Sequence, residues 1–320
     1  MPAKTKFELK LGLATREAYG KALVELGHTN AEVVVLDADL SKSTFTAEFG
    51  KQFPERFFEC GIAEANMTAI GAGLATVGKI PFASSFSVFS MNKGFEQLRV
   101  TAAYPNVNLK IVGTHSGISI GEDGPSQMSI EDLSLACSLP GFTVMSPADE
   151  VATMALVKRA AETFGPMFMR TGRLKTAVIY APDQEFVIGK AIQLIDGKDV
   201  TLIATGLMVA ESIRAAETLE GEGISARVID IHTIKPLDRD AITRAAQETG
   251  ALVVAEEHLR DGGLGVRVAQ VVAETHPAVM EFVGINNTYA ESATPDQLLD
   301  KYGLRAVNVA AAARRAIARK

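Results

Sequence analysis

Cysteine, clustered basic charge and long apolar runs are all scarce in this chain of 320 residues. Its two cysteines, Cys60 and Cys137, form neither a CxxC motif nor a Cys/His metal spacing, and two residues do not build a disulfide framework. We therefore expect two reduced thiols. We also expect no metal ligands from this chain.

The charge pattern excludes two further classes of partner. The formal net charge is −6, and lysine and arginine are dispersed along the chain, so neither nucleic acid nor a membrane surface is an expected partner. No stretch approaches the ~18 apolar residues of a membrane span, and the first twenty residues lack the apolar core of a signal peptide. We expect a cytoplasmic protein of roughly two domains, at ~100–200 residues each.

Strand-like and helix-like segments alternate through the first half of the chain. Apolar strands are predicted at Val33–Asp37, Phe57–Cys60, Pro81–Ser84, Leu109–Gly113, Thr143–Ser146 and Met167–Arg170. Helices are predicted at Thr15–Leu26, Ala63–Val77, Val88–Tyr104, Ile130–Cys137 and Asp149–Thr163. Continuous apolar strands separated by helices are typical of a parallel sheet that is covered on both faces.

The pattern breaks at Tyr180–Val187, where a proline and charges indicate a linker, and then restarts. Strands follow at Val200–Ala204, Ala226–Ile231, Ala251–Glu256 and Glu281–Ile285, and helices at Ala210–Leu219, Asp238–Thr249 and Gly265–Thr275, before two short terminal helices. The predicted fold class is α/β, with two consecutive α/β domains at residues 1–182 and 188–320, of which the second is smaller.

Polar and aromatic side chains follow the predicted strands of the first half, at the end where parallel sheets bind ligands. They are Asp39 and Ser43, Glu64, Phe86 and Phe89, His115, Asp123 and Gln127, and Arg173. Taken singly, each has a structural explanation: Glu64 could complement a helix dipole, the phenylalanines could be core, and Gly121–Pro125 could be only a tight turn. Their common position favours a binding site.

The chain resembles the C-terminal portion of transketolase, closest to the animal-type branch, over nearly its whole length. The motifs that carry the resemblance occur in the family's order: ATREAYGKAL, LDADLSKST, GIAEANMTAIGAGLA, PFASSFSVF, THSGISIGEDGPSQM, MRTGR and IHTIKPLD. The resemblance implies the pyrimidine-binding domain of a thiamine-diphosphate enzyme, followed by the transketolase C-terminal domain. Transketolases transfer a two-carbon ketol unit from a ketose to an aldose.

The resemblance assigns the cofactor-binding residues. Glu64 matches the family glutamate that protonates N1′ of the thiamine pyrimidine, a role that suits a carboxyl group in an apolar pocket. Phe86 and Phe89 match aromatic residues that pack on the pyrimidine ring. Asp39 matches an aspartate near the cofactor at the subunit junction. Gly262–Gly265 lacks the spacing of a dinucleotide motif and is interpreted as structural.

The resemblance also assigns the substrate-binding residues. His115 and Gln127 match positions that bond the oxygens at the donor's reacting end, and with Glu64 they form the expected catalytic set. Asp123 matches an aspartate that bonds a substrate hydroxyl. Arg16, Ser43 and Arg173 match the group that holds the terminal phosphate of a sugar phosphate, where a guanidinium can bond two oxygens.

One departure from the family concerns the metal. Transketolases bind the diphosphate through Mg²⁺ in an N-terminal domain marked by Gly-Asp-Gly, and this chain contains no Gly-Asp sequence. The resemblance therefore implies one subunit of a split enzyme, whose N-terminal partner subunit carries the diphosphate and Mg²⁺ site in an α2β2 heterotetramer. The alternatives are a 2-oxo-acid dehydrogenase β-subunit, half of a 1-deoxyxylulose-5-phosphate synthase, and a non-catalytic binding module. The sequence does not name the sugar, its pathway, or whether the anion is phosphate or sulfonate.

Overall fold

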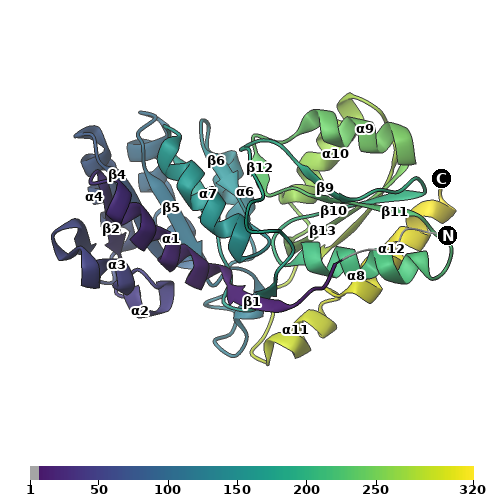
Figure 1. The fold of residues 1–320 in the computed structure, drawn as a ribbon, viewed down its shortest axis with the longest axis horizontal. Helices are drawn as coiled ribbons and strands as arrows, with labels where there is room; N and C mark the ends of the chain where they lie inside the picture. The colour runs from purple at the N-terminus through teal and green to yellow at the C-terminus, as the bar shows by residue number, and fades with distance from the viewer. Residues whose placement is uncertain (1–6) are drawn as a thin grey trace.

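The computed structural model describes residues 7–320 and places two α/β units side by side (Figure 1). The sheet of the first unit has seven strands, in the order β12 (Thr233–Lys235), β6 (Thr143–Met145), β7 (Met167–Arg170), β5 (Lys110–Thr114), β4 (Ile80–Phe86), β2 (Val33–Asp37) and β3 (Phe57–Glu59). Only β12 runs antiparallel to its neighbour. The predicted α/β class with mostly parallel strands is confirmed.

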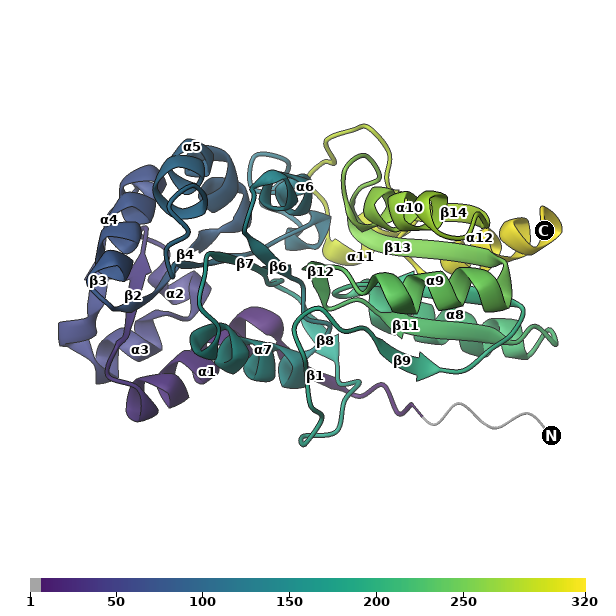
Figure 2. The same ribbon diagram turned by 90° about the horizontal axis from the view of Figure 1, so that it is seen from above.

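Helices cover both faces of this sheet (Figure 2). Helices α1 (Thr15–Thr29) and α7 (Glu150–Glu162) pack on one face, and α4 (Glu64–Thr76) and α6 (Asp132–Ser138) on the other. Short helices are α2 (Ser41–Thr44), α3 (Ala47–Gln52) and α5 (Phe95–Gln97). The helix predicted at 88–104 is irregular, because it widens into π-helical turns at Phe89–Lys93 and Leu98–Ala103.

The second unit has a five-stranded sheet in the order β14 (Val279–Ile285), β13 (Ala251–Leu259), β10 (Val200–Ala204), β11 (Ala226–Asp230) and β9 (Ile192–Ile195). Here β9 is the antiparallel strand. Helices α8 (Met208–Glu220) and α12 (Ala306–Ala318) pack on one face, and α9 (Arg239–Thr249) and α10 (Leu264–Glu274) on the other. Helix α11 (Pro295–Lys301) lies beside the first unit.

The two units share structure across their junction. Strand β12 belongs by sequence to the second half, yet it pairs with β6 and so extends the first sheet. Each of the two hydrophobic cores, one on either side of the sheets, contains buried residues of both units. A further antiparallel pair joins β1 (Leu11–Ala14) to β8 (Lys175–Ala177). The domain limits 1–182 and 188–320 stay predictions, and residues 1–6 lie outside the described part of the chain.

Within residues 7–320, no helix combines the length and the apolar character needed to cross a bilayer.

Candidate active site

The carboxyl ends of four neighbouring strands, β7, β5, β4 and β2, meet at one edge of the first sheet. Their last residues are Arg170, Thr114, Phe86 and Asp37, and all four side chains are buried. This is the edge at which the sequence predicted a ligand site, because parallel strands present their following loops on the same side.

The loop after β2 is folded around a buried carboxylate. Asp37 accepts hydrogen bonds from Oγ1 of Thr44 at 2.6 Å and Oγ1 of Thr46 at 2.8 Å, and burial raises its pKa to about 6. These bonds fix the turn that carries Ser43. The carbonyl oxygen of Ser43 accepts a hydrogen bond from Nη1 of Arg16, at the start of α1, at 2.7 Å.

His115 directly follows β5 and has a backbone φ of 57°, an uncommon value for a residue with a side chain. Its Nε2 lies 3.1 Å from Nη1 of Arg16, and its Nδ1 lies 2.8 Å from Oγ1 of Thr114. Since arginine only donates, Nε2 must accept and the ring proton sits on Nδ1. Burial, followed by the charges of Arg16 and Arg173, lowers the pKa of His115 to about 3. The ring is therefore neutral at physiological pH.

Two phenylalanines form a flat platform beside this histidine. The ring of Phe86 stacks on His115 with centroids 3.9 Å apart, and Phe89 stacks on Phe86 at 5.8 Å with only 9° between the ring planes. Glu64, the first residue of α4, is 3% exposed. Lys93 links the two features, because its Nζ lies 4.6 Å from the Phe89 ring centroid and 3.3 Å from Oε2 of Glu64. Sequence reasoning missed Lys93, although its spacing of four residues from Phe89 was a visible signal.

The segment His115–Met128, called the substrate loop below, carries the remaining predicted contacts. Arg173 anchors it by donating hydrogen bonds to the carbonyl oxygen of Ile120 and to Oε2 of Glu122, the latter at 3.4 Å. Asp123 is exposed and Gln127 is half-buried. Neither side chain makes a hydrogen bond within residues 7–320, so both are available to a ligand.

Asp39 stands apart from the hydrogen-bonded and stacked residues. It is exposed, has a φ of 61°, and donates its backbone N–H to Oε1 of Glu59 at 2.6 Å. The structure therefore connects Arg16, Ser43, His115 and Phe86 directly, with Phe89 stacked on Phe86, and leaves Asp39 on an outer turn.

Comparison with known proteins gives two family matches that together span most of the chain. Residues 12–177 match the family described as transketolase, pyrimidine binding domain, and residues 189–309 match the family described as transketolase, C-terminal domain.

The individual relatives differ in length: some are about as long as this chain, and others are about twice as long. The 6-deoxy-6-sulfo-D-fructose transketolase subunit SqwH of Clostridium sp. (strain MSTE9) is 39% identical over 315 residues, 98% of either chain. Transketolase-like protein 2 of Mus musculus is 44% identical over 309 residues, which are 95% of this chain but 49% of that protein. The chain thus spans about half the length of such longer relatives.

A solved structure described as split gene transketolase, inactive beta4 tetramer, superposes with a TM-score of 0.91 at 51% identity. The superposition covers 96% of this chain and 99% of that chain. The resemblance deduced from the motifs is confirmed.

Proposed function

The chain belongs to the transketolase family, where it corresponds to the C-terminal section of a split enzyme, and we propose that it supplies the pyrimidine-side and substrate-side half of the active site. The reaction is transfer of a two-carbon ketol unit from a ketose to an aldose. The observation that carries this proposal is the buried carboxylate of Glu64, which Lys93 links to the parallel rings of Phe86 and Phe89.

The residues at this platform fit the pyrimidine of thiamine diphosphate. A flat heteroaromatic ring stacks favourably on Phe86 or Phe89, and Glu64 offers a carboxyl group at the head of a helix for a ring nitrogen. When bound, the cofactor supplies the nucleophilic carbon that takes up the ketol unit. Glu64 would hold a proton at N1′, and the two phenylalanines would orient the ring and exclude water from it.

The diphosphate end of the cofactor and its metal ion have no matching cluster of ligands in the described part of this chain. Among residues 7–320, no three His, Cys, Asp or Glu side chains are grouped to hold a metal ion. Mg²⁺ at diphosphates takes one or two carboxylates together with phosphate oxygens. We therefore assign the Mg²⁺ and diphosphate contacts mainly to an N-terminal partner subunit.

The arginines suit the anionic end of a sugar substrate. Arg16 Nε is buried without a hydrogen-bond partner among residues 7–320. Burial lowers the pKa of Arg16; the charge of Glu17 opposes this, and the charge of Arg173 adds to it. Two close guanidiniums with a spare donor are stabilised by an anion. Phosphate esters and sulfonates both present three terminal oxygens to such a site, and the relative named as a 6-deoxy-6-sulfo-D-fructose transketolase subunit supports a sulfonate as one of the two. Ser43 would join the arginines at the anion, and His115, Asp123 and Gln127 would bond the polyol.

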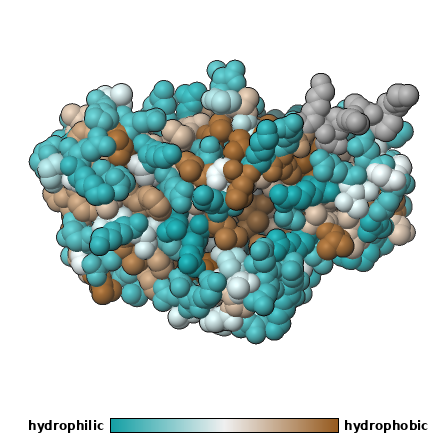
Figure 3. Space-filling model, turned by 60° about the horizontal axis from the view of Figure 1, so that its bottom comes forward, coloured by the Kyte–Doolittle hydropathy of each residue, from teal (hydrophilic) through white to brown (hydrophobic). Residues whose placement is uncertain are grey.

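Exposed hydrophobic side chains on the surface of the chain support an assembly with a partner. Large hydrophobic side chains are exposed around α4, which begins at Glu64: Ile62 at 75% and Val77 at 72%. Figure 3 shows hydrophobic side chains gathered across the middle of one face, with hydrophilic ones around them. Apolar patches of this kind mark interaction sites. We propose an α2β2 heterotetramer, in the cytoplasm, and an inactive lone chain.

The test is reconstitution. The purified chain is assayed with thiamine diphosphate, Mg²⁺, a ketose phosphate and an aldose phosphate, with and without the N-terminal subunit. We expect ketol transfer only from the mixture. Equal transfer by the lone chain would refute the division of the site, and no transfer by a mixture that forms a stable complex, across phosphorylated and sulfonated donors, would refute the activity.

A further inference from the structure

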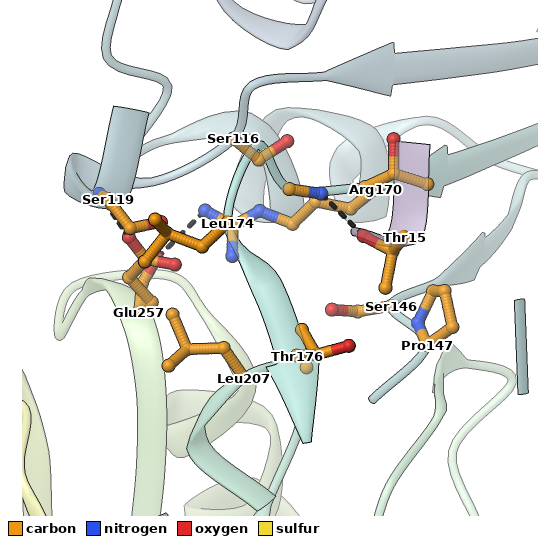
Figure 4. A pocket seen from close by; sticks show the side chains of 13 residues that line it. Thr15, Ser116, Ser119, Ser146, Pro147, Arg170, Leu174, Thr176, Leu207 and Glu257 are labelled. Atoms are coloured by element: carbon orange, nitrogen blue, oxygen red, sulfur yellow. Dashed lines mark hydrogen bonds between the residues drawn. The ribbon is translucent and has the colours of Figure 1, made fainter. Parts of the chain in front are cut away.

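We propose that Glu257, a residue of the second unit, is a positioning residue for the substrate loop. This inference rests on the proposed function, since it assigns to the C-terminal unit a part in placing substrate contacts. Glu257 lies near the end of β13, is 6% exposed, and turns its side chain toward the first unit (Figure 4). No motif in the sequence marked it.

The carboxylate of Glu257 holds the loop backbone directly. Its Oε1 accepts a hydrogen bond from the backbone N–H of Ser119 at 2.6 Å, across 138 positions of sequence. Both groups are buried, so the bond is shielded from water. Ser119 lies four residues after His115 and precedes Asp123 and Gln127, so this bond acts on the part of the loop that carries the last two of these predicted contacts.

Gly117 is shaped to receive the same carboxylate. Its φ is 80°, and a Cβ atom at this position would overlap the carboxyl atoms of Glu257. Glycine is thus needed here for the backbone conformation and also for the space. The loop and the carboxylate are complementary in shape as well as in hydrogen bonding.

The neck of the loop is tied to the same strand. The backbone N–H of Gly117 donates to the carbonyl oxygen of Ser129 at 2.8 Å, which closes the loop. Arg170 Nη2 donates to that oxygen at 3.1 Å and to the carbonyl oxygen of Glu257 at 2.8 Å. Glu257 therefore holds the loop in two ways. Its side chain bonds Ser119, and its backbone is joined through Arg170 to Ser129 at the loop's closing pair.

Glu257 positions the loop rather than touching the substrate. The cavity that it lines with Ser116, Ser119 and Arg170 holds about 30 Å³, enough for a water molecule and far too small for a sugar. Removing the carboxylate should therefore displace the part of the loop that carries Asp123 and Gln127, while His115 stays held by Arg16, Thr114 and Phe86. Cofactor binding on the Phe86–Phe89 platform should be left unchanged.

The chain offers a matched control in the neighbouring residue. Glu256 is also buried on β13, but its carboxylate accepts the backbone N–H groups of Leu264 at 2.7 Å and Gly265 at 2.8 Å, at the start of α10 in its own unit. Replacing Glu256 removes a buried carboxylate from the same strand without touching the loop.

The experiment compares Glu257→Ala, Glu257→Gln and Glu256→Ala. In the isolated chain, amide hydrogen exchange of Ser119 should rise about tenfold or more in Glu257→Ala, by the loss of a bond to a charged acceptor. It should stay near the wild-type rate in Glu257→Gln, whose amide oxygen still accepts, and in Glu256→Ala. In the complex with the N-terminal subunit, Glu257→Ala should raise KM for the ketose about tenfold, with a smaller change in kcat and an unchanged Kd for thiamine diphosphate.

The outcomes separate the two proposals. Unchanged Ser119 exchange in Glu257→Ala, or an equal rise in Glu256→Ala, would overturn the positioning role. Raised exchange with an unchanged KM would also overturn it, because the loop would then not depend on this bond for substrate. Should Glu257→Ala not fold, the milder Glu257→Asp, with a shorter side chain, is expected to show the same split. An inactive wild-type complex would refute the proposed function, while the exchange data would still decide whether Glu257 holds the loop.

Discussion

Arg16 and His115 meet through a single contact, Nη1 to Nε2 at 3.1 Å, although 99 positions separate them in the sequence. The contact fixes the histidine as a neutral acceptor and leaves Nε of Arg16, buried and without a partner among residues 7–320, as a donor for something else. An anion at Arg16 would draw the guanidinium and release Nε2 of His115 for a substrate hydroxyl. In the function proposed above, the pair would thereby couple recognition of the substrate's charged end to its polyol chain.

The first prediction concerns this anion. Arg16→Ala and Arg173→Ala should raise KM for phosphorylated substrates more than they lower kcat, because a lost charged hydrogen bond costs about 1.5–3 kcal/mol. Steady-state kinetics of the assembled pair measures both constants. The control is a donor without the anionic group, and a loss of the same size with that donor would exclude these arginines as anion ligands.

The second prediction concerns the charge of His115. Its NMR signal should titrate near pH 3 instead of near the ordinary value of 6.5, because burial and two arginines lower its pKa. A lowered folded-state pKa means that the unfolded chain binds the proton first. The contribution of this group to stability is therefore full above pH 6.5 and falls as the pH drops from 6.5 toward 3.

A matched variant separates the effect of burial on the pKa of His115 from the effect of the neighbouring arginine charges. Arg16→Met removes one charge and keeps most of the packing, so the pKa of His115 should rise but stay below 6.5. A midpoint near 6.5 in the unaltered chain would show that the ring is solvated and not held as described.

The sequence predicted the part of the site that lies at strand ends. Glu64, Phe86 and His115 each follow an apolar strand within a few residues, and parallel strands carry such positions to one edge. Lys93 escaped notice because a lone lysine on a helix usually faces solvent. Glu257 escaped because its partner lies 138 positions away, and no local pattern reports a contact between two units.

The missed strands have a related cause. Strands β1, β8, β9 and β12 are only three or four residues long, too short for an alternation of apolar and polar residues to appear. Each forms through an antiparallel partner that is distant in the sequence. The long buried strands β2, β5 and β10 needed no such partner to be recognised, because a run of mostly apolar residues already indicates burial on both faces.

The third prediction concerns the aromatic platform. Phe89→Leu should leave the fold intact, since Phe89 is only partly buried, and should weaken thiamine diphosphate binding to the assembled pair about two- to tenfold, from the ~0.5–1.5 kcal/mol of an aromatic pair. Calorimetric titration of the cofactor gives the Kd. A matched change at Phe95→Leu, a partly buried phenylalanine in α5, serves as the control. Equal weakening in both variants would argue that Phe89 acts through packing alone.

Glu64 provides the most direct test of the whole account. In the complex with the N-terminal subunit, the exchange of the C2 proton of bound thiamine diphosphate into D₂O is followed by NMR for the wild type and for Glu64→Gln. The amide is nearly the same size but cannot hold the acid proton at N1′. A positioned acid typically contributes ~10²–10⁴-fold to a rate, and we expect the C2 exchange rate to fall by at least that factor while the cofactor stays bound. Exchange at the wild-type rate in a cofactor-loaded Glu64→Gln complex would contradict the account.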